Sequence, residues 1–128
     1  MKKVIHLILH ALALALGIIG IYLAFKNHNQ SGIANMYSLH AWIGIGVIVL
    51  YVDIWVRDLL LPRRESILWH VVFGIIVYVL AVGNASLGFL EKLTFLERSG
   101  LDKFGTEAFL VNFTTIITVL FGVLLYSR

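Results

Sequence analysis

The chain has 128 residues, of which 60% are hydrophobic and 13% are charged, and its mean hydropathy is +0.95. Soluble domains are nearer half apolar and a quarter charged, and a small soluble fold could not bury this much apolar surface, so lipid is the expected solvent. The net charge of +3 comes from cations spread along the chain, which excludes a nucleic-acid-binding arm, and the absence of cysteine excludes disulfides, zinc thiolates and iron–sulfur clusters.

Four mostly apolar stretches approach or exceed the roughly 20 residues that a helix needs to cross the hydrocarbon core. They are predicted at residues 4–25, 39–61, 67–90 and 108–126. Period-two alternation is missing and a closed barrel needs more strands than this length allows. We therefore expect an all-α membrane protein, a bundle of four transmembrane helices in a single domain. The expected connecting loops are 26–38, 62–66 and 91–107.

The first stretch follows Met1, Lys2 and Lys3, a start that also resembles a secretory signal peptide. Its apolar run of about 22 residues is too long for the core of a signal peptide and lacks a convincing small-residue cleavage site. It also contains two histidines. A membrane-spanning helix is the favoured interpretation.

The second stretch is interrupted in its last third by Asp53, Arg57 and Asp58. Asp53 and Arg57 stand four residues apart with the acid first, which predicts an ion pair on one face of the helix. Arginine near the end of a span can extend its charge to the membrane surface. We therefore expect residues 39–61 to cross the membrane with a charged end.

The distribution of cations predicts the orientation of the four spans, which place both termini on one side. Six cations fall on the side of the termini, namely Lys2, Lys3, Arg57, Arg63, Arg64 and Arg128. Four fall on the other side, namely Lys26, Lys92, Arg98 and Lys103. Because short cytoplasmic segments carry the excess of Lys and Arg, both termini are predicted to be cytoplasmic.

The histidines are the most informative residues, because an ionisable side chain inside a span indicates function by default. His6 and His70 lie a few residues inside the same membrane surface on two different predicted helices. Two facing imidazoles are the axial ligands of a bis-histidine haem b. Two interpretations stay open for this pair, a haem site and a pair of hydrogen-bonded boundary residues.

The other polar residues within the spans are expected to serve helix packing. His10, one turn deeper than His6, is predicted to form a hydrogen bond between helices. His40 begins the second span on the opposite side of the membrane, and His28 falls in the first outer loop. Side chains and glycines expected at helix contacts are Asn84, Asn112, Thr114, Thr115, Thr118, Gly17, Gly20, Gly44, Gly46, Gly83 and Gly88.

Two pairs of cations, Lys2 with Lys3 and Arg63 with Arg64, lie on the side of His6 and His70. One interpretation is that they only set the topology. The other is an anion site at the membrane surface, close to the haem. No motif of a hydrolase, a zinc protease or a phosphate-binding loop occurs in the sequence.

Five short motifs resemble the eukaryotic cytochrome b-561 family, most closely its plant members. They are residues 2–6 (KKVIH), 35–42 (NMYSLHAW), 68–70 (LWH), 83–92 (GNASLGFLEK) and 106–108 (TEA). The resemblance covers nearly the whole chain, in the family's order. It implies a fold with two bis-histidine haems b, one near each face, and transfer of single electrons from cytoplasmic ascorbate to monodehydroascorbate or ferric iron.

The resemblance also implies roles for single residues. His6 and His70 resemble the axial pair of the cytoplasmic-side haem, and His40 resembles one ligand of the outer haem. Lys3, with Lys2 beside it, resembles a lysine that helps to bind cytoplasmic ascorbate. The other matches are Asn35, Met36, Tyr37 and Ser38 against the outer haem, Glu91 near a haem, Arg63 or Arg64 at the ascorbate site, and His28 near the outer substrate site.

The sequence departs from the family pattern in two places. It begins at the family's third span, so the span that supplies the partner of His40 has no counterpart here, and we expect one haem with a second in doubt. A homodimer is one route by which His40 could gain a second ligand. Residues 52–66 form a shorter stretch than the family has, so the arginine match is fixed only to within about one residue.

Together these observations predict a haem b membrane oxidoreductase that takes electrons from cytoplasmic ascorbate and delivers them to monodehydroascorbate or a ferric chelate. The alternative is a truncated membrane protein without catalytic activity, which would act through helix association.

Overall fold

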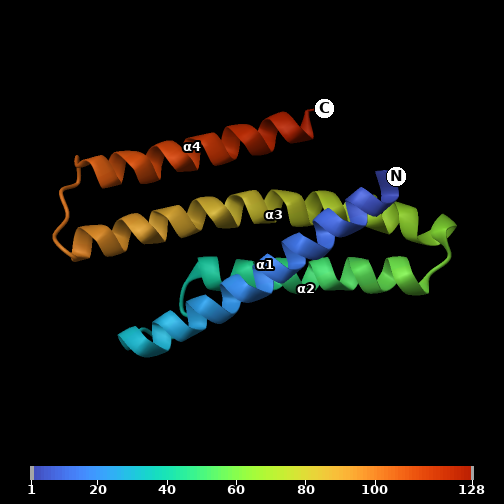
Figure 1. Ribbon diagram of the computed structural model, residues 1–128, viewed down its shortest axis with the longest axis horizontal. Helices are drawn as coiled ribbons and strands as arrows, with labels where there is room; N and C mark the ends of the chain where they lie inside the picture. The colour runs from blue at the N-terminus through green and yellow to red at the C-terminus, as the bar shows by residue number, and fades with distance from the viewer. Residues whose placement is uncertain (1, 128) are drawn as a thin grey trace. The chain divides into compact units, whose positions relative to one another are not determined.

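The computed structural model describes residues 2–127, except for the side chains of Lys2 and Arg63. These described residues form four α-helices and no strand (Figure 1). The helices are α1 (Lys2–Ser31), α2 (Leu39–Leu60), α3 (Arg63–Arg98) and α4 (Thr106–Tyr126). Each is long and apolar enough to cross a membrane. The predicted all-α fold and the four predicted spans are therefore confirmed.

The chain divides into two compact units, Met1–Val77 and Tyr78–Arg128. The first unit contains α1, α2 and residues 63–77 of α3, and the second contains the rest of α3 with α4. The expectation of a single domain stays a prediction.

In the first unit, a very short turn connects α2 to α3. Leu61 is extended (φ −96°, ψ 148°), as the residue before a proline prefers, and this ends α2. The carbonyl of Pro62 then accepts hydrogen bonds from the backbone N–H groups of Glu65 and Ser66, which begins α3. The chain therefore reverses within two residues, so the end of α2 lies beside the start of α3.

The connection from α1 to α2 is built from local hydrogen bonds. Gly32 has φ +66°, and the N–H of Ile33 donates to the carbonyl of His28, which is the closing pattern of a helix that ends in a left-handed glycine. Ser38 begins α2, because its hydroxyl accepts a hydrogen bond from the backbone N–H of Ala41 at 3.2 Å. As Figure 1 shows, α1 crosses α2, and Gly17 allows the crossing because a Cβ there would lie 2.5 Å from Ile48.

Three predicted loop boundaries are wrong, because helices continue past the apolar stretches. The loop predicted at 26–38 is helical to Ser31, α3 begins at Arg63 instead of after 66, and α3 continues to Arg98 through the loop predicted at 91–107. Hydropathy predicts the part of a helix that lies in the hydrocarbon core of the membrane. The helix itself ends where the backbone conformation changes. In α1 and α3 that change occurs at Gly32 and Gly100, both with positive φ.

Few apolar side chains are buried within the described chain. Ile54 and Val77 are 8% and 6% exposed, whereas Leu59 and Leu16 are 85% and 68% exposed. Water would not tolerate such wide apolar exposure, but lipid does. The composition and the surface therefore both indicate an integral membrane protein.

In the second unit, residues 78–98 of α3 run antiparallel to α4 after the connection 99–105 (Figure 1). Gly122 permits this packing, because a Cβ there would lie 3.0 and 3.1 Å from the two methyl groups of Val82. The carbonyl of Gly122 also accepts a hydrogen bond from the Tyr78 hydroxyl at 2.5 Å. Gly122 was not among the glycines predicted at helix contacts, because no second glycine lies near it in α4.

Candidate functional site

The start of α1, the end of α2 and the start of α3 carry the histidine pair predicted from depth. At about 1.5 Å per residue, His6 and His70 lie about 6 Å and about 10 Å along their helices from Lys2 and Arg63. The structure brings the two rings together, with centroids 6.1 Å apart and planes inclined at 56°. His6 and His70 therefore face each other from two helices, as the matched depth predicted.

The spacing of this pair fits a shared iron. A metal–imidazole bond is about 2 Å long, so two rings that bind one metal from opposite sides have centroids about 6 Å apart. The observed 6.1 Å agrees with that distance. Among the described residues there is no group of three His, Asp or Glu side chains that could hold a bare metal ion. Two imidazoles suffice for haem, because the porphyrin supplies the other ligands.

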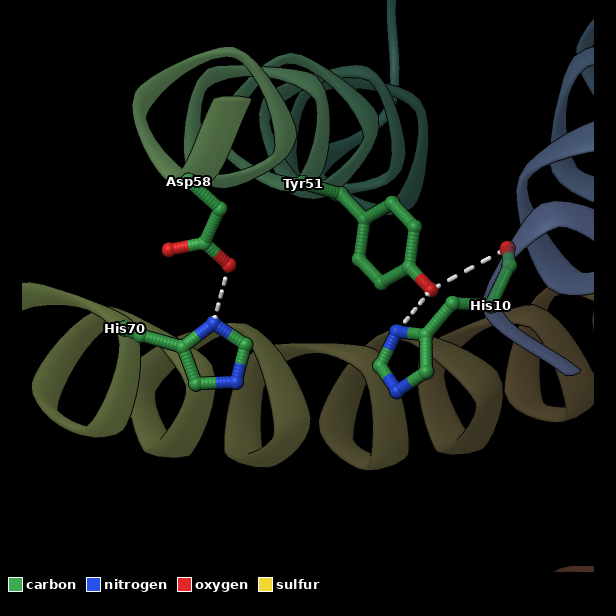
Figure 2. A network of polar contacts seen from close by, with 4 residues as sticks. All are labelled: His10, Tyr51, Asp58 and His70. Carbon is green, nitrogen blue, oxygen red and sulfur yellow. Dashed lines mark hydrogen bonds and ion pairs between the residues drawn. The ribbon is translucent and has the colours of Figure 1, made fainter. Parts of the chain in front are cut away.

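His10 joins α1 to α2, as predicted for a hydrogen bond between helices. The Tyr51 hydroxyl lies 2.5 Å from Nδ1 of His10 and donates to its backbone carbonyl at 3.2 Å (Figure 2). The two rings are stacked, with centroids 5.5 Å apart. The His10 ring also lies against His6, with centroids 4.0 Å apart. His10 therefore supports one side of the His6 ring.

Asp58 on α2 contacts the other member of the pair. Its Oδ2 atom lies 2.5 Å from Nδ1 of His70, which is 12 residues away in the sequence (Figure 2). From the sequence, Asp58 is predicted only to interrupt an apolar span. The available signal was the proline four residues later, because a chain reversal there returns α3 along the end of α2.

Two of the predicted ascorbate-binding cations have described side chains. Lys3 is exposed and stands three residues before His6, on the same face of α1. Arg64 is exposed in the first turn of α3. Arg63 also lies in that turn instead of the predicted loop, but its side chain and that of Lys2 lie outside the described residues. The predicted ion pair between Asp53 and Arg57 is confirmed at 2.6 Å.

The opposite end of α2 holds the residues predicted for the outer haem. His40 lies in the first turn of α2, two residues after the capping residue Ser38. The Asn35 amide donates to Asn29 at 2.6 Å, while its buried Oδ1 has no hydrogen-bond partner among the described residues. Met36 has φ 59°, and Tyr37 is 65% exposed.

Two further predictions concern residues that the structure places in helices. His28 was expected in a loop but lies in the last turn of α1, because that helix continues to Ser31. Glu91 lies within α3 in the second unit, not in a loop. Its predicted position near a haem stays a prediction.

Comparison with known proteins agrees with the motifs. Residues 1–96 match the family described as eukaryotic cytochrome b561. The chain is 64% identical to transmembrane ascorbate ferrireductase 1 of Arabidopsis thaliana, over 94% of this chain and 54% of that protein. It is 61% identical to ascorbate-specific transmembrane electron transporter 1 of Zea mays, over 94% of this chain and 55% of that protein.

A more distant relative is a transmembrane ascorbate-dependent reductase of Sus scrofa, which is 37% identical over 97% of this chain and 53% of that protein. The chain spans about half the length of the curated relatives it matches. The family match covers most of the chain and includes the motifs around His6, His40 and His70. The chain belongs to the eukaryotic cytochrome b561 family.

Proposed function

We propose that this chain is a haem b membrane oxidoreductase that transfers single electrons from cytoplasmic ascorbate toward monodehydroascorbate or ferric iron. The observation that carries the proposal is the facing pair His6 and His70, with ring centroids 6.1 Å apart. The names of the relatives, an ascorbate-specific electron transporter and an ascorbate ferrireductase, support the choice of donor. Family membership favours this function over helix association without catalysis.

His6 and His70 would hold one haem b through one ring nitrogen each. When bound, haem b supplies an iron that changes reversibly between its ferric and ferrous states. Neutral imidazole suits both states, so the ligands need not change during electron transfer. For a second haem near the other face, the chain offers His40 as one ligand, with the motif residues 35–38 before it in the sequence. We expect one haem per chain.

Lys3 and Arg64 would attract the ascorbate anion to the membrane surface near His6 and His70, together with Lys2 and Arg63. Both described cations are exposed, at the beginnings of the two helices that carry the histidine pair. Charges in such a position raise the local concentration of an anion and orient it by hydrogen bonds. We infer that both termini are cytoplasmic and that His28 is on the acceptor side.

A haem count tests the proposal. The protein is purified in detergent, titrated with haem, and examined by reduced-minus-oxidised spectra. We expect about one haem per chain with a b-type spectrum, loss of that haem in His70→Ala, and an unchanged haem count in the control His28→Ala. Absence of a b-type spectrum would refute the proposal and support the non-catalytic alternative. Two haems per chain would show that the expectation of one is wrong.

A further inference from the structure

Asp58 makes a contact that the family motifs do not include. Its Oδ2 atom lies 2.5 Å from Nδ1 of His70 across the turn between α2 and α3. The side chains of Asp58 and His70 are 36% and 38% exposed. Asp58 falls in residues 52–66, the stretch that is expected to differ from the family pattern.

The contact determines which ring nitrogen of His70 has a lone pair available to bind iron. A carboxylate only accepts hydrogen bonds, so the proton of a neutral His70 ring must lie on Nδ1, where it donates to Asp58. The lone pair is then on Nε2, which Figure 2 shows on the side of the ring away from Asp58. A neutral imidazole with this proton position can bind iron only through Nε2.

The other carboxylate of the same helical segment gives a contrast. Asp53 pairs with Arg57 on its own helix at 2.6 Å. Asp58 instead reaches a histidine on the next helix. Histidines that bind metals commonly donate their second N–H to a carboxylate, which fixes the ring and makes the ligand more basic.

We propose that Asp58 is a positioning residue for His70, which fixes the ring with Nε2 free and increases the electron donation of the imidazole to haem iron. This inference rests on the proposed function, because His70 must be an axial ligand. Stronger donation stabilises the ferric state more than the ferrous state, so Asp58 lowers the midpoint potential of the haem.

Two substitutions separate the charge from the hydrogen bond. Asp58→Asn removes the charge but keeps an oxygen that can accept from Nδ1, and Asp58→Leu removes both. We expect Asp58→Asn to raise the midpoint potential by about 60 mV, a tenfold change in the preference for ferrous iron. We expect Asp58→Leu to weaken haem binding by about 10- to 100-fold. The control Asp53→Asn removes the same charge from the same helix and should change neither quantity.

Redox titration measures the midpoint potential, and haem titration measures haem binding; together they test the role of Asp58. An unchanged potential in Asp58→Asn would overturn the inference, as would an equal shift in Asp53→Asn, because a general charge effect would then explain it. Since Asp58→Leu could fail to fold, the conclusion depends on Asp58→Asn, whose size and shape match the parent.

A measurement without haem separates this inference from the proposed function. In the haem-free protein, ¹⁵N shifts of the His70 ring should show the proton on Nδ1, and Asp58→Leu should move the population toward Nε2–H. If the parent binds no haem, the proposed function fails and so does the role of Asp58 toward haem. If the parent binds haem and Asp58→Asn behaves like the parent, only the role of Asp58 fails.

Discussion

The two ends of the first unit both carry histidines, but the grounds for proposing a haem site differ between the two ends. At one end, side chains from three helices contact one another, namely His6, His10, Tyr51, Asp58 and His70. At the other end, the hydrogen bonds described for Ser38 and Asn35 serve the ending of α1 and the beginning of α2. The proposed site at His6 and His70 therefore rests on contacts between helices, whereas the role proposed for His40 rests on the family motif.

The strongest test of this difference removes one histidine from each end. We expect His6→Ala to abolish haem binding, because the iron loses one of its two axial ligands. We expect His40→Ala to leave the haem count near one. The measurement is the ratio of haem to protein after detergent purification and haem titration. Equal losses in the two variants would show that the two ends are not different in this respect.

A smaller effect concerns the cations at the surface of the His6 and His70 end. Removing Lys3 and Arg64 together should raise the ascorbate concentration for half-maximal reduction by about tenfold, because each exposed charge contributes up to about 1 kcal/mol. The parent should lose part of its affinity at high salt, and the double variant should respond less. Stopped-flow reduction of the haem measures both the ascorbate concentration for half-maximal reduction and its dependence on salt. If the variant matches the parent, these cations only set the topology.

Substitutions of Tyr51 and Ser38 are expected to lower the free energy of unfolding by similar amounts, so their effects on the haem can be compared. Tyr51→Phe removes a hydrogen bond between α1 and α2, and Ser38→Ala removes a helix cap, each at a cost of about 1 kcal/mol. Only Tyr51→Phe should alter the electron paramagnetic resonance signal of the haem, because His10 lies against His6. Denaturant titration measures the free energy of unfolding. A changed haem signal in Ser38→Ala would contradict the separation of the two ends.

Much of this site could be predicted from residue spacing alone. Composition predicts the four spans. The matched depth of His6 and His70 predicts that their rings lie at the same level, because both helices cross the same membrane. The ion pair between Asp53 and Arg57 also follows from local spacing.

Contacts between helices could not be predicted in the same way. Which face of α2 meets α3 depends on the turn at Pro62, so the contact of Asp58 with His70 was missed. The helical ends at Ser31 and Arg98 were missed for another reason. Polar residues there prefer water, but nothing in their backbone ends a helix before Gly32 and Gly100.

The smallest expected effect compares the two carboxylates near the end of α2. Arg57→Ala should cost only about 0.3–0.5 kcal/mol, because the pair with Asp53 is exposed and lies within one helix. Asp53→Ala should cost the same, and the double variant little more, since one interaction is lost in each case. The haem potential should not change. If Arg57→Ala shifts the potential as Asp58→Asn does, the charged end of α2 acts as one unit on His70, and the contrast between Asp53 and Asp58 fails.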